Sequence, residues 1–329
     1  MTYSSGGLIQ AADYNTFATN LNAVWSTGTG DSGWGQTAIS NVAASGQVTA
    51  TNWATLVNTL ATSGTQTVTT ITSRAAPTTG TLISILANVA TDTTSVTTNR
   101  GNAVGQGATS STWTGAIAKT TATGSGQAAW TITWTQTITW ASADAARYFF
   151  NAGGLLVMNM SKTSTGTDID ADWNAFAGQV GTLYISGRVN SAAQTINGTS
   201  YTGTTRIGGS GGTQTTLATT TGWYQLTAGA AATTLFQLNN ATSPYTGEYI
   251  RVTAAKNAGS TALTLVTTWF QPAVATVGTT CNISGGTDTT SPYSAFGTAP
   301  AVLCRYIPPS TTYLTTASWG TPTWASSVA

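Results

Sequence analysis

Apolar and hydroxyl side chains alternate strictly along residues 130–140. Every even position in this stretch is Trp, Ile or Gln, and every odd position from 131 to 139 is threonine. A two-residue period is typical of a β-strand that buries one face and exposes the other. We therefore predict a long strand here. The threonines at the odd positions form a single row, the threonine file, on one face of this strand. The file could form a flat repetitive surface, as in ice-binding proteins, but contact with solvent or packing between subunits is the better explanation for one isolated file.

An aromatic run follows this strand after a short polar linker. Residues 148–150 are Tyr-Phe-Phe, and they lead into Asn151-Ala152-Gly153-Gly154. Asn and Gly suit tight turns, so we predict a turn there and a returning strand at residues 155–160. The centre of the protein is thus expected to be a β-sheet built on large aromatic side chains.

Short strands separated by turn residues continue towards the C-terminus. A clear hairpin joins residues 249–254 to residues 262–270. Residues 82–89 fit either a strand or a helix, and the C-terminal part, rich in Pro and Trp, fits an extended arm or edge strands. The remaining predicted strands are residues 68–71, 183–189, 222–227 and 234–238. This spacing favours a mainly β protein with an antiparallel sandwich or jelly-roll-like body.

The N-terminal part has a helical period instead. Residues 9–17 are echoed by residues 48–56, and in each copy apolar residues recur three and four positions apart. We predict two short amphipathic helices. Their apolar positions are Tyr14, Phe17, Leu21 and Val24 in the first copy and Trp53, Leu56, Val57 and Leu60 in the second. A weaker echo at residues 169–176 predicts another short helix, with Asp170 or Asp172 near its start.

A Gly-rich loop lies between the two predicted helices at residues 28–35. It lacks the lysine and the preceding buried strand of a phosphate-binding loop, so we predict a linker. The patterns together divide the chain into a small helical attachment or assembly module at residues 1–66, a β-sandwich body at 67–270 and a β-rich C-terminal extension or arm at 271–329.

Charge is scarce. The 329 residues include nine acids, ten bases and no histidine, so 6% are charged, against about 25% in an ordinary soluble domain. A near-neutral surface attracts neither nucleic acid nor anionic membranes, and it favours association with other protein. We expect a homo-oligomer without membrane insertion, because no apolar run is long enough for a membrane helix. The N-terminus lacks the regions of a signal peptide, which predicts synthesis in the cytoplasm without export by that route.

We predict no catalytic, cofactor-binding or metal-ligating residue. The lack of histidine excludes Ser-His-Asp and Cys-His sites and histidine metal cages. Glu248, the only glutamate, is expected to be a solvent-facing charge at a strand edge; pairing it with an aspartate as in a glycosidase has no support from the spacing. Asp168, Asp170 and Asp172 resemble the start of a calcium loop, but Trp173 replaces the required glycine, so a turn leading into a helix is favoured.

Two further sets of side chains leave alternatives open. Trp113, Trp130, Trp134 and Trp140 could form a stacking platform for a sugar, although tryptophan at alternate strand positions is more often part of a core. Cys281 and Cys304 could form a disulfide or remain buried thiols, and the sequence favours neither.

Several motifs resemble those of tailed-bacteriophage virion structural proteins. They cover about two thirds of the chain, and the C-terminal residues least. The motifs are Gly7-Leu-Ile-Gln-Ala-Ala-Asp-Tyr-Asn, Gly30-Asp-Ser-Gly-Trp-Gly-Gln, the second copy at Val48, Arg147-Tyr-Phe-Phe-Asn-Ala-Gly-Gly, Asp172-Trp-Asn-Ala-Phe, Val180-Gly-Thr-Leu, and the strand pair Tyr249-Ile-Arg-Val and Leu263-Thr-Leu-Val.

This resemblance implies a particle component without enzymatic activity, made in the host cytoplasm and located in the virion. An oligomeric tail or collar fibre or appendage subunit is expected, with a trimer favoured. Its partners would be identical subunits and, through the N-terminal module, other virion proteins. The alternatives are a carbohydrate- or receptor-binding adhesion module, with a host surface glycan as partner, and a capsid decoration protein.

Overall fold

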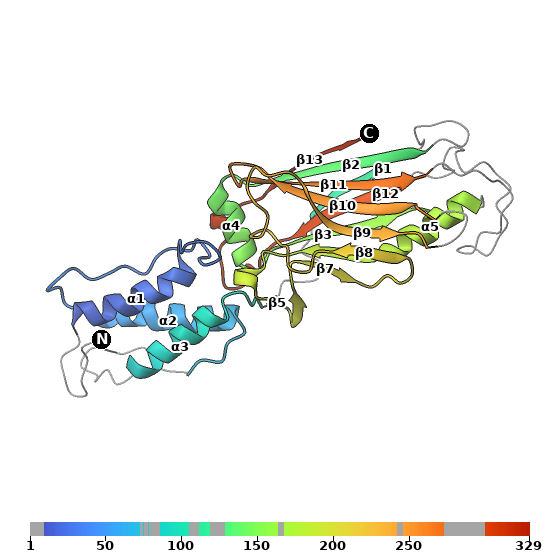
Figure 1. Cartoon of the computed structure of the whole chain (residues 1–329). Coiled ribbons are helices and arrows are strands. Elements are labelled where there is room, and N and C mark those ends of the chain that lie inside the picture. The colour runs from blue at the N-terminus through green and yellow to red at the C-terminus, as the bar shows by residue number, and fades with distance from the viewer. Residues whose placement is uncertain are drawn as a thin grey trace.

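The computed structural model places a small group of helices at one end of a two-sheet β-sandwich (Figure 1). The fold predicted from the sequence, a mainly β protein with antiparallel sheets and a helical N-terminal part, is confirmed. The residues that the structure describes are 10–72, 75, 78, 86–104, 112–118, 129–163, 168–241, 246–272 and 300–329.

Three helices make up the helical part: α1 (Ala11–Trp25), α2 (Ala50–Gln66) and α3 (Leu86–Thr98). α3 contacts both α1 and α2, so the helical part runs past the expected boundary at residue 66. Of the two structures considered for residues 82–89, the described portion from Leu86 onwards is helical.

The two copies of the N-terminal repeat contact each other through equivalent residues. Tyr14 and Trp53, which occupy the same position in the two copies, meet edge to face with ring centroids 5.5 Å apart. The Tyr14 hydroxyl donates to the Asn52 carbonyl at 3.3 Å. The second copy begins with a capping box, in which the Asn52 backbone N–H donates to Thr49 Oγ1 and the Thr49 N–H donates to Asn52 Oδ1.

One sheet of the sandwich has six antiparallel strands in the order β13-β2-β11-β10-β9-β8. The strands are β2 (Trp130–Thr139), β8 (Thr213–Leu217), β9 (Thr233–Asn239), β10 (Tyr249–Lys256), β11 (Ala262–Gln271) and β13 (Thr323–Val328). The predicted long strand, the predicted strand at residues 234–238 and the predicted hairpin are therefore confirmed. The last strand of the chain is an edge strand, one of the two alternatives expected for the C-terminal part.

The other sheet has five antiparallel strands in the order β1-β12-β3-β4-β7. They are β1 (Thr112–Ala118), β3 (Leu155–Ser161), β4 (Thr182–Ile185), β7 (Thr204–Ile207) and β12 (Ala301–Ile307), and a separate hairpin consists of β5 (Gln194–Ile196) and β6 (Thr199–Tyr201). β12 pairs on both sides, so this segment of the expected C-terminal extension is an inner strand of the body.

The core between the sheets consists mainly of aromatic and aliphatic side chains. From Ile132 onwards the even positions of β2 face inward, and Ile132, Trp134 and Ile138 are fully buried. Trp269 of β11 packs against Trp134 and stacks on Trp173, with ring centroids 5.4 and 5.2 Å apart. These ring contacts tie α5 (Asp168–Val180), which carries Trp173, to the inward side of the six-stranded sheet.

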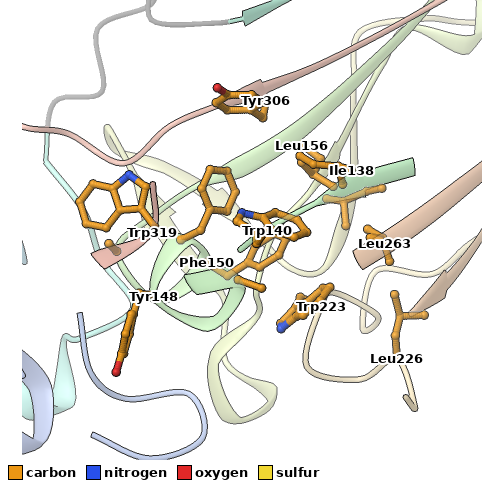
Figure 2. Close-up of a cluster of buried hydrophobic side chains, with 14 of the residues drawn as sticks. Ile138, Trp140, Tyr148, Phe150, Leu156, Trp223, Leu226, Leu263, Tyr306 and Trp319 are labelled. Atoms are coloured by element: carbon orange, nitrogen blue, oxygen red, sulfur yellow. The ribbon is translucent and has the colours of Figure 1, made fainter. Parts of the chain in front are cut away.

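Two helices cover the ends of the sandwich, α4 (Ala143–Asn151) and α5 (Asp168–Val180). α4 corrects the prediction for the aromatic run, because Tyr148, Phe149 and Phe150 belong to a helix and not to the sheet. The helix starts at Ser142, whose Oγ accepts from the Ala145 backbone N–H. Figure 2 shows the resulting cluster, in which Phe150 packs beside Trp140 and Trp223.

Two other predicted strands are wrong. Residues 68–71 form no strand, and Val68 has a φ of 52°, which lies outside the extended region. Residues 222–227 form turns, and their apolar side chains Trp223 and Leu226 are buried at the end of the core. The predicted strand at residues 183–189 is shorter than expected, because β4 ends at Ile185. At residues 222–227 the tertiary packing of Trp223 and Leu226, and not local propensity, decided the backbone conformation.

Candidate functional site

The most developed polar site joins the helical part to the sandwich. It consists of loop residues 27–36, which follow α1, together with Arg147 and Asn151 of α4 and Tyr224. We call this site the joint. Among the described residues it connects three segments that are far apart in the sequence, so its residues set the position of the helical part relative to the sandwich.

Glycine gives the loop its shape. Gly28, Gly30, Gly33 and Gly35 all have positive φ, the region that residues with a Cβ rarely adopt. A Cβ on Gly35 would lie 2.5 Å from the Tyr148 ring, so the loop touches α4 directly. Behind the loop, the backbone N–H groups of residues 34–36 donate to carbonyls of residues 24–26, at 2.8 to 3.1 Å, which folds it back onto the end of α1.

Arg147 holds two carbonyls of the loop. Its guanidinium donates to Ser32 O at 2.6 Å and to Thr27 O at 2.7 Å. It also pairs with Asp144, one turn earlier on α4, at 2.9 Å. Arginine suits this position because its planar fork presents several N–H donors in fixed directions.

Asn151 and Tyr224 complete the contact. Asn151 Nδ2 donates to Gly33 O at 2.9 Å, and Asn151 Oδ1 accepts from the Tyr224 hydroxyl at 2.5 Å. The same hydroxyl lies 3.2 Å from Gly30 O. Burial raises the pKa of Tyr224 far above its usual value of 10, so the phenol stays protonated and donates.

Further contacts lie on either side of the joint. The Thr315 backbone N–H donates to Gln36 Oε1 at 2.8 Å, and Gln36 Nε2 donates to Ser318 Oγ at 3.2 Å. Arg100, just after α3, pairs with Asp31 of the loop at 3.1 Å. Gln36 therefore adds a second point at which the loop is fixed to the body, and Arg100 fixes the loop to α3.

The joint brings together two of the sequence motifs quoted above. Gly30-Asp-Ser-Gly-Trp-Gly-Gln supplies the loop, and Arg147-Tyr-Phe-Phe-Asn supplies the helix that holds it. The prediction of a linker missed this contact. The phosphate-cradle alternative also missed this contact. Such a cradle requires free backbone N–H groups, but the N–H groups of residues 34–36 donate to carbonyls of residues 24–26. The groups that the loop offers to other side chains are carbonyls, which accept from Arg147 and Asn151. The available signal was the spacing of Arg147 and Asn151, four residues apart on one helix face.

The outward face of the six-stranded sheet is a second candidate site. We call it the hydroxyl face, and it consists of Thr131, Thr133, Thr135, Thr137, Thr139, Gln237, Asn239, Tyr249, Arg251, Thr253, Ala255, Thr264, Val266, Thr268 and Phe270. These residues alternate with buried ones, and most are partly exposed. Their register places the threonine file of β2 beside Thr264, Val266 and Thr268 of β11. The single threonine file seen in the sequence is thus part of a broader surface.

Arg251 is the only charged residue of the hydroxyl face. Its guanidinium lies over the Tyr249 ring, 5.1 Å from the centroid. Tyr249 in turn stacks on Phe270 at 4.9 Å. Nearer the other end of the face, the hydroxyls of Thr137 and Thr264 bond to each other at 3.0 Å.

Glu248 is not the exposed edge charge that the sequence predicted. Its side chain is fully buried, and Asn240 Nδ2 donates to Glu248 Oε2 at 2.8 Å. Burial raises the pKa of Glu248 well above its usual value near 4.5, and the negative charge of Asp172, also fully buried, raises it further, while the Asn240 bond opposes the shift. Neither carboxyl is placed to meet a substrate in this structure.

Two of the four tryptophans considered as a stacking platform for a sugar are not exposed, so the prediction is wrong for them. Trp134 and Trp140 are 0% and 2% exposed and belong to the core. The side chains of Trp113 and Trp130 lie outside the described residues.

Cys304 is buried, which raises the pKa of its thiol. Whether it forms a disulfide with Cys281 stays open, because Cys281 lies outside the described part of the chain.

The three aspartates that resemble a calcium loop lie in the first turns of α5, so this segment is helical and has no loop of ligands. Across the described ranges, no three His, Cys, Asp or Glu side chains come together as a metal site. In the same residues, no helix combines the length and apolar character needed to cross a bilayer.

Comparison of the chain with protein-family models, with curated proteins and with solved structures gave no match.

Proposed function

We propose that this chain is a non-enzymatic structural subunit of a tailed-bacteriophage particle, an oligomeric tail or collar fibre or appendage. The joint is the observation that carries this proposal. A subunit that positions other proteins needs a fixed angle between its attachment element and its body, whereas a flexible linker allows the two to move independently. The side chains of Arg147, Asn151 and Gln36 replace such a linker with a set of short hydrogen bonds.

Two further observations support the proposal. Two of the motifs that resemble virion structural proteins, those beginning at Gly30 and Arg147, also form the joint. The scarcity of charge, with 6% charged residues in the whole chain, suits a protein whose surface is covered by other subunits. In this proposal the helical part contacts other virion proteins and the sandwich contacts identical subunits, with a trimer favoured.

Incorporation into particles tests the attachment role. Thr16 and Thr55 are exposed, occupy equivalent positions in the two repeat copies, and each bonds only a carbonyl one turn earlier. A tagged full-length chain, produced in cells that make tailed-phage particles, should sediment with the particles in a density gradient. The Thr16→Glu, Thr55→Glu variant should lose most of this association, because it places two charges on the attachment surface.

The matched control carries two charges on exposed threonines elsewhere, Thr199→Glu and Thr227→Glu. It should sediment with particles as the unmodified chain does. If the unmodified chain stays at the top of the gradient in every particle preparation, the proposed function is wrong. If both variants incorporate normally, the helical part is not the attachment element.

A further inference from the structure

We propose that identical copies of this chain meet through the hydroxyl face. The inference rests on the proposed function, which calls for identical partners, and it names the surface that such a partner would cover. The sequence alone predicted that the low-charge surface packs against identical subunits and offered one threonine file as a possible contact.

The size of the face suits a stable contact. The outward side of the whole six-stranded sheet, with strands about 4.8 Å apart and about eight residues long at about 3.4 Å per residue, measures roughly 29 by 27 Å, or about 800 Å². The hydroxyl face occupies the four inner strands of this side, β2, β11, β10 and β9. Stable protein interfaces bury about 800 Å² on each partner. A contact that covers this side of the sheet, centred on the hydroxyl face, would therefore supply a complete interface without a contribution from the helical part.

The other sheet is less suited to this role, because part of its outward face is already occupied. The β5–β6 hairpin covers it through a small second core of Ala103, Leu155, Ile196 and Tyr201. Tyr201 packs on Tyr184 of β4 with ring centroids 5.2 Å apart. On the hydroxyl face, by contrast, Thr131 is exposed and the other β2 threonines are partly exposed.

The chemistry of the hydroxyl face favours a copy of itself as the partner. Each threonine hydroxyl both donates and accepts, so two such faces can bond to each other without a second type of surface. A highly charged partner would find one charge to match, Arg251, and that group already lies over Tyr249. Two copies would bring few like charges together, so the usual electrostatic penalty for like surfaces is small.

The shape of the face also permits close approach. A row of small and medium side chains crosses the hydroxyl face and continues onto the edge strand β13 beside it, because Thr253 pairs with Val266, Val266 with Thr135, and Thr135 with Ser327. Twisted sheets pack face to face at a small angle when their side chains are of similar height. In a dimer this row would lie against the same row of the partner, and in a trimer the three faces would turn towards a common axis.

Charge placed in the middle of the row tests the inference. The molar mass of the unmodified full-length chain is measured by light scattering and sedimentation velocity over a range of concentrations. We expect a stable multimer. The Thr135→Glu, Thr253→Glu variant should weaken association about 100-fold or more, because like charges would meet across the interface.

The Thr135→Lys, Thr253→Lys variant should weaken association in the same way, and an equal mixture of the Glu and Lys variants should recover it as opposite charges meet. This recovery also excludes misfolding as the cause of the loss. The Thr199→Glu, Thr227→Glu chain serves as the control with equal added charge and should keep the mass of the unmodified chain.

The outcomes separate this inference from the proposed function. A multimer that both charged variants leave intact would overturn the hydroxyl face as the contact and leave the homo-oligomer standing. A chain that stays monomeric at high concentration would overturn the contact itself. Sedimentation with particles, which depends on the helical part, answers the question of the virion role independently of both results.

Discussion

Replacing Arg147 with alanine should loosen the joint without unfolding the protein. The side chain is 15% exposed and donates its two shortest bonds to the carbonyls of Thr27 and Ser32. Removing it leaves both carbonyls without this donor. It also removes the contact of the guanidinium with the Tyr148 ring, 4.7 Å from the centroid.

The magnitude follows from these contacts. Hydrogen bonds from a charged donor contribute about 1.5–3 kcal/mol each when buried, and less here because water can reach the edge of the loop. The ion pair with Asp144 adds little, since that carboxylate is 66% exposed. We expect Arg147→Ala to lower the free energy of unfolding by about 2–3 kcal/mol, which leaves most domains folded.

Hydrogen exchange localises the effect. The backbone N–H groups of residues 34–36 bond to the end of α1 and should be protected in the unmodified chain. A loss of about 2 kcal/mol in the free energy of opening corresponds to roughly 30-fold faster exchange at these amides. Amides in β2 and β11, in the centre of the six-stranded sheet, should exchange as before. Urea unfolding followed by tryptophan fluorescence gives the global free energy.

Arg147→Lys provides the matched comparison. It keeps the positive charge, but one ammonium group cannot reproduce the two directions of the guanidinium fork, so about half of the loss should remain. Unchanged exchange at residues 34–36 in Arg147→Ala would refute the reasoning. It would mean that the loop is held by its own bonds to α1 and that the contact with α4 does not fix it.

Three further changes test other parts of the structure. Gly35→Ala should destabilise the fold by about 2–4 kcal/mol in urea unfolding, because φ is 70° and the new Cβ would meet the Tyr148 ring; a neutral effect would contradict the close approach. Glu248 has a raised pKa in the folded chain, so its protonated form stabilises the fold below the unfolded pKa near 4.5, and that contribution is lost as pH rises towards the folded pKa. Glu248→Gln should therefore raise Tm at about pH 8 and change it little at about pH 4, and equal Tm shifts at both pH values would show that the carboxyl is not desolvated. Trp269→Ala should cost about 3–5 kcal/mol, because it removes the ring stacked on Trp173, and a loss below about 1 kcal/mol would mean that this stack does not hold α5 to the six-stranded sheet.

The sequence by itself determined those elements whose pattern is local. The alternation in residues 130–140 identified β2 because each second side chain enters one core. The hairpin of β10 and β11 followed from two alternating runs and a short turn, and the repeated apolar spacing identified α1 and α2. Such signals depend only on which face of a short segment is buried.

Tertiary structure decided the features that depend on distant neighbours. The aromatic run at residues 148–150 became helical because the end of the core accepts a helix there, where Trp223 from a far-off turn stacks on Phe150. Glu248 is buried because α5 and the strand ends close around it, which its flanking residues do not reveal.

The same reason applies to the two candidate sites. The loop at residues 27–36 has the composition of a linker, and only the contact with α4 makes it part of a joint. The hydroxyl face exists because β2 pairs with β11, which brings Thr137 beside Thr264, 127 positions later in the chain. A local pattern fixes which way a side chain points along its own strand, but strand order and the burial of polar groups are set by long-range packing, which no short segment encodes.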